Sequence, residues 1–261
     1  MECERSLSEK QRHKTALILG GLSSIGKDLL EKVCKNFANV LVTETGSNYE
    51  ELNIWCTGLR ERSPKTMITT FQTDVTDVRQ IEDLGNYISE NEIEIGVLYY
   101  LPGINILTPA IKETEENWDR IQNVNIKGFF FASQMAARNM IMHGGGNIIG
   151  IASQHGVVAN VDRAAYCASK AAMIHLSKEL SLEWAKYGIR VNTVSPTMIL
   201  SEKNETILNT PHARKDYLSR IPLKQYARPE DVSDAAIFLS SAGAKMITGQ
   251  NLIVDGGWTI S

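Results

Sequence analysis

A tyrosine and a lysine lie four positions apart in the segment RAAYCASKAA, residues 163–172, among side chains that are otherwise mostly small. On a helix, residues spaced by four share one face, so Tyr166 and Lys170 would lie side by side. A neighbouring ammonium favours the ionised form of a phenol, and lowering the pKa of tyrosine from about 10 to near 7 takes roughly 4 kcal/mol. The spacing therefore predicts that Tyr166 is a general acid and base usable at neutral pH. The alternative is an alanine-rich buried helix whose lysine reaches out to solvent.

A second segment, LILGGLSSIGKDLL, runs from an apolar stretch into an amphipathic one, with glycines at positions 20, 21 and 26. A tight glycine turn lets backbone N–H groups approach a pyrophosphate, and the positive end of the following helix attracts the same charge. Eighteen residues after Gly26, Glu44 ends the next apolar stretch. A carboxylate there can bond the ribose hydroxyls of a dinucleotide and repel the extra phosphate of NADP, which favours NAD. The alternatives are an ordinary strand-to-helix turn and a solvated glutamate.

Short aliphatic or β-branched runs recur along the chain, at residues 15–19, 39–43, 67–71, 95–100, 147–151, 190–194 and 251–255. Amphipathic stretches with helical periodicity separate them. Alternating strands and helices require a parallel sheet that is covered on both faces. We therefore predict a single doubly wound, Rossmann-type α/β domain over residues 15–261, with a seven-stranded parallel sheet. A polar N-terminal extension is expected over residues 1–14 and a substrate lid over about 197–226.

The bulk composition excludes several classes of protein. The formal net charge is −3 over 261 residues, with lysine and arginine spread along the chain, so no nucleic-acid partner is expected. No stretch approaches the roughly 20 apolar residues that span a bilayer, so no membrane partner is expected. The four cysteines lie far apart and fit neither a zinc site nor a disulfide framework, and no metal is expected. A soluble cytoplasmic protein is the simplest expectation.

Together these segments resemble the short-chain dehydrogenase/reductase family, over about residues 15–258. The family turn reads Thr-Gly-x-x-x-Gly-x-Gly, and Gly20 and Gly26 match its outer glycines. Leu19 replaces the threonine and Ser24 the middle glycine, which costs on the order of 1 kcal/mol if position 24 needs a positive φ. The family also uses Asn, Ser, Tyr and Lys in a fixed order and spacing, which is matched by Asn125, Ser153, Tyr166 and Lys170.

The resemblance implies a role for each member of this tetrad. Ser153 hydrogen-bonds the substrate oxygen, and Tyr166 exchanges the proton. Lys170 also holds the nicotinamide ribose, while Asn125 anchors a water that extends the proton relay. The cofactor itself carries the hydride.

Further landmarks complete the expected NAD site. Asp74 resembles the family aspartate that contacts adenine, or else it is the N-cap of the next helix. The segment at 190–197 resembles the strand and turn beside the nicotinamide, and that at 247–258 resembles an end that joins subunits into a homotetramer. YLPG, residues 100–103, replaces the family's Asn-Asn-Ala-Gly. Pro102 removes a backbone donor near the adenosine ribose, so the resemblance does not extend to the family's affinity for the cofactor. The residues expected to bind cofactor are Gly20, Leu22, Ser23, Ser24, Ile25, Gly26, Glu44, Asp74, Val75, Leu101, Pro102, Gly103, Tyr166, Lys170, Pro196, Thr197 and Ile199.

The segments IASQHGVVANVDRAAYCASK and VSPTMILSE look most like the sugar and polyol dehydrogenases of this family, including xylulose reductases, threitol dehydrogenases and gluconate 5-dehydrogenases. This implies hydride transfer between NAD(H) and a secondary alcohol or ketone of a small sugar or polyol, with Ser153, His155 and Tyr166 contacting the substrate. His155 is otherwise a loop histidine satisfied by backbone or water. Two rival hypotheses are a 3-oxoacyl thioester reductase, which would use NADPH, and a binding or regulatory scaffold with impaired cofactor binding.

Overall fold

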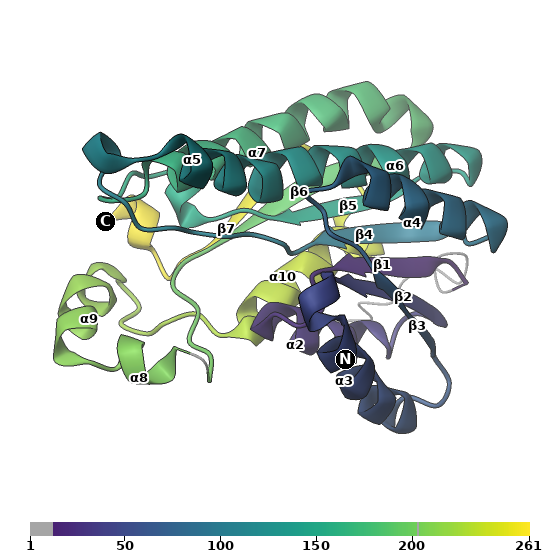
Figure 1. The fold of residues 1–261 in the computed structure, drawn as a ribbon, viewed down its shortest axis with the longest axis horizontal. Helices are drawn as coiled ribbons and strands as arrows, with labels where there is room; N and C mark the ends of the chain where they lie inside the picture. Colours follow the sequence, from purple (N-terminus) through teal and green to yellow (C-terminus); the bar gives the residue numbers. More distant parts are fainter. Residues whose placement is uncertain (1–12, 203) are drawn as a thin grey trace.

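The seven expected strands all form, and they pair in one parallel sheet (Figure 1). The strands are β1 Thr15–Leu19, β2 Asn39–Glu44, β3 Met67–Gln72, β4 Ile95–Tyr100, β5 Gly146–Ile151, β6 Ile189–Pro196 and β7 Asn251–Val254. The computed structural model describes residues 13–202 and 204–261. Within them the strand order is β3-β2-β1-β4-β5-β6-β7, so β1 pairs with both β2 and β4. The strand order reverses at β1, and ligands bind at such a switch point in open α/β sheets.

Helices cover both faces of this sheet, which confirms the doubly wound fold (Figure 1). They are α2 Ser24–Val33, α3 Tyr49–Arg62, α4 Val78–Glu90, α5 Glu115–Gln122, α6 Gly128–Met142, α7 Ala164–Trp184, α8 Glu205–Leu208, α9 Pro211–Asp216 and α10 Pro229–Ser240. The apolar sides of α2, α3 and α10 pack on one face, and those of α4, α6 and α7 on the other.

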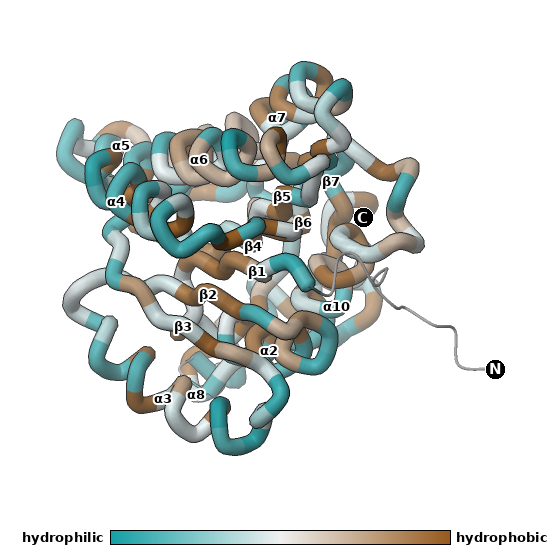
Figure 2. The backbone as a smooth tube through the Cα atoms, turned by 90° about the vertical axis from the view of Figure 1, so that its right-hand side faces the viewer, coloured by the Kyte–Doolittle hydropathy of each residue, from teal (hydrophilic) through white to brown (hydrophobic). Residues whose placement is uncertain are grey.

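The strands are apolar along their whole length because their alternate side chains enter two different cores. In β1, Ile18 joins the core under α2, whereas Leu17 and Leu19 join the core under α6. Figure 2 shows the hydrophobic segments gathered in the central strands and the hydrophilic ones on the outer turns of helices such as α4. This burial fixes the sheet, and the sheet fixes where its carboxyl-terminal edge places side chains.

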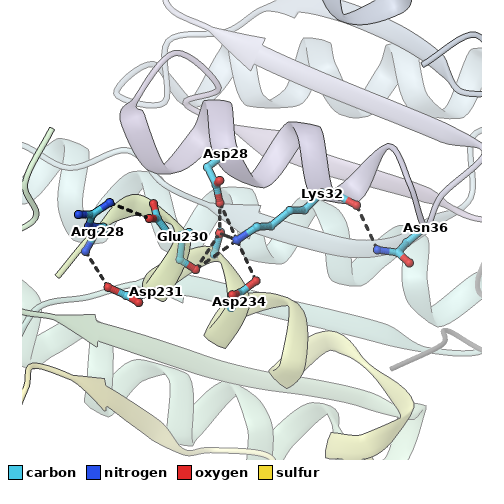
Figure 3. A network of polar contacts seen from close by, with 8 residues as sticks. Asp28, Lys32, Asn36, Arg228, Glu230, Asp231 and Asp234 are labelled. Carbon is cyan, nitrogen blue, oxygen red and sulfur yellow. Dashed lines mark hydrogen bonds and ion pairs between the residues drawn. The ribbon is translucent and has the colours of Figure 1, made fainter. Parts of the chain in front are cut away.

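A polar cluster clamps α2 to α10 (Figure 3). Lys32 of α2 lies 2.9 Å from Asp28 on the same helix and 2.8 Å from Asp234 on α10. Its Nζ also donates a hydrogen bond to Ser233, whose hydroxyl donates to Asp28. Lys32 and Asp28 are partly buried. A buried charge is costly unless it is paired and hydrogen-bonded, and both groups here are. The helix that follows the glycine-rich turn is therefore held against the helix that follows the expected lid.

The expected N-terminal extension is only partly within view, because residues 1–12 lie outside the described residues. Lys14, which the sequence analysis placed in that extension, is buried. Its Nζ donates to the backbone oxygens of His143, at 2.6 Å, and Gly145, at 3.1 Å. Lys14 therefore packs against the loop that leads into β5.

The expected lid segment contains α8 and α9, which Figure 1 shows set apart from the two helical layers. Leu208, Ile221 and Tyr226 form a small apolar core with Trp258 near the C-terminus. A β-bridge joins Ile199 to residue 227 and closes the segment at its base. Among all the residues that the structure describes, no helix is long and apolar enough to cross a bilayer.

Candidate active site

Two cavities adjoin along the carboxyl-terminal edge of the sheet, where parallel strands place their ligands. The turn cavity, of about 400 Å³, includes the predicted residues Gly20, Leu22, Ser23, Glu44, Asp74, Val75, Leu101, Pro102 and Gly103. The tetrad cavity, of about 330 Å³, includes the predicted residues Ser23, Ile25, Leu101, Gly103, Ser153, His155, Tyr166, Lys170, Pro196, Thr197 and Ile199. Ser23, Leu101 and Gly103 line both cavities, so the two form one cleft.

Three of the predicted residues lie outside this lining. Gly26 and Asn125 are buried behind it. Ser24 lines a third cavity, of about 800 Å³, between the start of α2 and α8. The structure therefore brings nearly all of the predicted residues to one cleft.

The glycine-rich turn has the close backbone packing that a dinucleotide-binding turn needs. Gly20 has a φ of 80°, in the left-handed region that favours glycine. Any Cβ on Gly26 would lie 2.5 Å from the backbone oxygen of Gly21, so only glycine fits. Ser23 caps α2 by accepting a hydrogen bond of 3.0 Å from the Gly26 N–H. Ser24 is the first residue of α2 and is not among the residues with positive φ, so the strain considered for it does not arise.

Glu44, at the end of β2, ties the glycine-rich turn to the neighbouring strand. Its Oε2 accepts a hydrogen bond of 3.1 Å from the Leu22 N–H, and its Oε1 accepts one of 3.1 Å from the Thr45 N–H. The carboxylate is thus held in a fixed orientation in the lining of the turn cavity. A carboxylate in this position can reach ribose hydroxyls.

Asp74 follows β3 and lines the same cavity. Its Oδ1 accepts hydrogen bonds from the backbone N–H and the hydroxyl of Thr76, and Asp77 is the N-cap of α4. The alternative interpretation of Asp74 as that N-cap is therefore wrong. The adjacent Thr73 is buried, and its hydroxyl has no hydrogen-bond partner among the described residues. Buried polar groups normally have a hydrogen-bond partner, so the Thr73 hydroxyl is a candidate contact for the cofactor. Thr73 is not among the residues predicted from the sequence.

Residues 100–103, which differ from the family sequence, pack against the glycine-rich turn. A Cβ on Gly20 would lie 3.2 Å from the Pro102 nitrogen and 3.3 Å from its Cδ, so the proline ring rests on the glycine turn. The Leu101 N–H donates to the Leu19 oxygen at 3.1 Å, which continues the pairing of β4 with β1. Pro102 therefore shapes the turn cavity without breaking the sheet.

The predicted Tyr-Lys pair shares one side of α7. The Lys170 Nζ lies 5.8 Å from the centre of the Tyr166 ring. Lys170 is only 3% exposed, and its Nζ donates a hydrogen bond of 2.8 Å to the Ile151 oxygen at the end of β5. Ser153, two residues further along, is also buried at the cavity. Burial lowers the pKa of Lys170 to about 7.

The pKa of Tyr166 is raised by burial, and the hydrogen bond with Ser153 opposes this only in part. The spacing of Tyr166 and Lys170 in the sequence predicts the opposite, a pKa of Tyr166 lowered by Lys170. That expectation was wrong for this structure, because Lys170 is itself buried and loses much of its charge near neutral pH. The desolvation of Tyr166 therefore outweighs the hydrogen bond with Ser153 and the charge of Arg163, which are the causes that lower its pKa.

Asn125 lies in a π-helical turn, Asn123–Lys127, between α5 and α6. Its Nδ2 donates to the Ile104 oxygen at 3.0 Å and to the Ser169 Oγ at 2.9 Å, and its Oδ1 accepts from the Ile104 N–H at 2.9 Å. Asn125 thus ties the loop after β4 to α7. Single π-helical turns are frequent at functional sites. Its expected part in anchoring a water stays a prediction.

Three polar side chains in the tetrad cavity have buried atoms without hydrogen-bond partners among the described residues. They are both amide atoms of Gln154, both ring nitrogens of His155 and the Thr197 hydroxyl. Burial, and then the charge of Arg163, lower the pKa of His155 to about 4, against an opposing contribution from the backbone of Val158. Neutral imidazole can donate one hydrogen bond and accept another. Gln154 is not among the residues predicted from the sequence, although its position directly after Ser153, at the end of β5, was a usable signal.

The cleft combines the glycine-rich turn and a carboxylate at one end with a phenol, a hydroxyl and an amine at the other. The orphaned Thr73 and Thr197 hydroxyls and the glycine cradle fit a dinucleotide along it. No group of three histidine, cysteine, aspartate or glutamate side chains within residues 13–202 and 204–261 is placed to hold a metal ion. The arrangement suits proton exchange with an alcohol or ketone beside a hydride carrier.

Comparisons with known proteins agree with this geometry. Residues 20–259 match the family model described as Enoyl-(Acyl carrier protein) reductase. The chain is 35% identical over 247 residues to an NAD-dependent glycerol dehydrogenase of Listeria innocua, covering 95% of this chain and 94% of the relative. It is 34% identical over 244 residues to a 3-oxoacyl-[acyl-carrier-protein] reductase FabG of Rickettsia prowazekii, covering 94% and 96%. The solved structure of a gluconate 5-dehydrogenase from Burkholderia cenocepacia, in complex with NADP and tartrate, has a TM-score of 0.87 at 27% identity and covers 98% of each chain.

Proposed function

This chain belongs to the short-chain dehydrogenase/reductase family, and we propose that it transfers a hydride between NAD(H) and a secondary alcohol or ketone of a small polyol or sugar. The observation that carries the proposal is the single cleft, in which Glu44 lines one end and Ser153 and Tyr166 line the other. Such a cleft suits a dinucleotide whose reactive end meets a proton-exchanging side chain.

In the oxidation direction, the substrate loses a hydride from carbon and a proton from its hydroxyl. Bound nicotinamide would supply the hydride acceptor. Ser153 hydrogen-bonds the substrate oxygen, and the Tyr166 phenolate takes the hydroxyl proton as the carbonyl forms. Lys170 stabilises the phenolate by its positive charge, and Asn125 holds the loop beside Lys170 in place. In the reduction direction, Tyr166 returns the proton to the substrate oxygen.

The lining of the tetrad cavity favours a polyhydroxylated substrate. Gln154 and His155 present buried donors and acceptors that no described residue satisfies. A substrate with several hydroxyls can pair with them, whereas an acyl chain would leave them unpaired at a cost of about 1 to 3 kcal/mol for each group. The glycerol and gluconate dehydrogenases to which the chain is similar favour the same class.

A substrate panel tests this proposal. Polyols and ketoses are expected to turn over, and Gln154→Leu is expected to lower kcat/KM for the best of them by about 30-fold, because a substrate hydroxyl loses its partner. Gln134→Leu, the same substitution at a partly exposed position of α6 that lines neither cavity, is the matched control and should leave kcat/KM unchanged. Polyols and ketoses that are all inert, with turnover of a 3-oxoacyl thioester, would contradict the proposal.

The second candidate function is reduction of a 3-oxoacyl thioester. It is favoured by the FabG relative, whose identity to this chain is close to that of the glycerol dehydrogenase. Against it stand the unpaired polar atoms of the tetrad cavity and the carboxylate of Glu44, which disfavours NADPH. The same panel, run with NADPH, distinguishes the two.

The preference for NAD rests on Glu44. Glu44→Gln removes the charge that repels the extra phosphate of NADP and leaves an oxygen that can still accept from the Leu22 N–H. We expect the ratio of the Kd for NADP to the Kd for NAD to fall at least about tenfold, or about 1.4 kcal/mol, by calorimetry. Glu50→Gln, on the exposed side of α3, is the control. An unchanged ratio would refute the role of Glu44, and no heat with either cofactor would favour the scaffold hypothesis.

The assembly and location of the protein are part of the same proposal. We propose that the chain forms a homotetramer through residues 247–258, which resemble the family segment that joins subunits. A cytoplasmic location is proposed from the sequence composition and the spacing of the cysteines. Apolar side chains are exposed at this end, with Ile253 37% and Ile260 89% accessible. Residues 197–226 serve as the substrate lid, which is supported by the place of Ile199 in the lining of the tetrad cavity.

A further inference from the structure

Tyr100 ends β4 where the family resemblance had led us to expect an asparagine. Its side chain is fully buried, and its hydroxyl donates a hydrogen bond to the backbone oxygen of Val124. Its ring packs edge-on against Phe129, with 5.4 Å between ring centres. Val124 lies in the π-helical turn and directly precedes Asn125. Tyr100 therefore joins the end of β4 to the turn that carries a member of the tetrad.

The chain leaves room for this contact. Gly128 begins α6, and any Cβ there would overlap the Tyr100 hydroxyl and approach the backbone oxygen of Val75 to 2.9 Å. A larger residue at this position would displace the hydroxyl from Val124. The large side chain of Tyr100 therefore fits only because residue 128 is glycine, at the point where β4 meets the π-helical turn.

The turn held by Tyr100 places Asn125 close to Lys170. A Cβ on Gly103 would lie 3.1 Å from the Lys170 Nζ and 3.6 Å from the Asn125 Oδ1, so both polar groups face the same glycine. Asn125 also holds the loop at Ile104 through two hydrogen bonds to its backbone. A shift of the Val124 oxygen would therefore change the position of Asn125 relative to Lys170.

We propose that the Tyr100 hydroxyl is a positioning group for the proton relay, because it anchors the π-helical turn that sets Asn125 beside Lys170. The inference rests on the proposed function, in which Lys170 supports Tyr166. The titratable groups that face this region are Lys170 and Tyr166 from α7 and Asp74 from the end of β3. Tyr100 itself lines neither cavity, although the Val124 that it holds lines the turn cavity. It therefore acts on the proton relay through the turn that carries Asn125.

The test compares two tyrosines that lose the same atom. Tyr100→Phe removes the hydroxyl and keeps the ring against Phe129. Tyr99→Phe is the matched control, because Tyr99 is equally buried and bonds Ser240 at 2.6 Å in the core on the other face of the sheet. Both variants are expected to lose similar thermal stability.

Only Tyr100→Phe is expected to change the chemistry. We expect kcat for polyol oxidation to fall about tenfold, with KM for NAD within twofold of wild type. The inflection in the pH profile of kcat should move to higher pH, because Asn125 shifts relative to Lys170 and Lys170 then supports the Tyr166 phenolate less well. A kcat and pH profile equal to those of Tyr99→Phe would overturn the proposal.

A readout independent of turnover separates this inference from the proposed function. The Ile104 amide donates to the Asn125 Oδ1, so its hydrogen-exchange rate reports the position of Asn125. Tyr100→Phe should speed this exchange several-fold, and Tyr99→Phe should not. If the wild-type protein turns over no polyol or ketose, the proposed function fails. Unchanged exchange at Ile104 in Tyr100→Phe contradicts the positioning role in either case.

Discussion

Tyr166→Phe is expected to lower kcat for polyol oxidation by about a thousandfold, while the Kd for NAD changes by less than about threefold. The substitution removes only the phenolic oxygen, which in the proposed mechanism accepts the substrate proton as the phenolate. The ring keeps its place on α7 beside Lys170, and the glycine-rich turn and Glu44 are untouched. Steady-state kinetics and calorimetry with NAD measure the two quantities separately.

A second tyrosine provides the control for this result. Tyr187 follows the other end of α7, where it is 40% exposed and lies away from the cleft. Tyr187→Phe should keep both kcat and the Kd for NAD. Turnover of Tyr166→Phe within tenfold of wild type would show that another group exchanges the proton.

Lys170→Met is expected to abolish turnover and yet to stabilise the fold. Lowering the pKa of Lys170 from 10.5 to about 7 corresponds to roughly 5 kcal/mol of unfavourable burial of the charged form. Methionine fills similar space without that charge, although the Ile151 oxygen loses its hydrogen bond. We expect the free energy of unfolding at pH 7, without added cofactor, to rise by about 2 kcal/mol in denaturant titrations.

The pH dependence of that stability carries a definite sign. The folded-state pKa of Lys170, about 7, lies below its ordinary value of 10.5, so the unfolded chain binds more protons between these two pH values. The stability contribution of this site in the wild type therefore rises as pH increases from about 7 to 10.5. The advantage of Lys170→Met should shrink over the same range. Lys178→Met, at an exposed position of α7, should show no such trend.

Much of the fold could be predicted because its signals are local. The strand β4, for example, is a continuous apolar run whose bounds, Ile95–Tyr100, follow directly from the sequence. Gly20 and Gly26 could be assigned to the turn because the roles of glycine in backbone geometry are specific. The effect of Ser24 was harder to predict, because a serine is strained only if the backbone at position 24 has a positive φ. In the structure α2 begins at Ser24, and its φ is not positive.

The electrostatics of the site could not be predicted in the same way. Whether Lys170 lowers the pKa of Tyr166 depends on how deeply both groups are buried, which is a property of the assembled core rather than of a spacing of four. Thr73 and Gln154 were missed for a related reason. Their hydroxyl and amide atoms stand out only once the fold shows that no neighbour pairs with them.

The buried pair of Tyr166 and Lys170 requires that cofactor binding change their protonation states. With a raised pKa for Tyr166 and a lowered pKa for Lys170, both groups favour their neutral forms. The proposed mechanism of oxidation uses the phenolate of Tyr166 and the ammonium of Lys170 together. Closing the cleft around oxidised cofactor and substrate must therefore stabilise the charged pair over the neutral one.

The most direct test of this account is a titration of the Tyr166 phenol itself, by the ultraviolet absorbance of tyrosinate in wild type minus Tyr166→Phe, with and without saturating NAD. The account predicts a pKa above the ordinary value of 10 without NAD and a pKa below 10 when NAD is bound. A difference spectrum that shows the Tyr166 pKa staying above 10 in both conditions would contradict the assignment of Tyr166 as the proton-exchanging group.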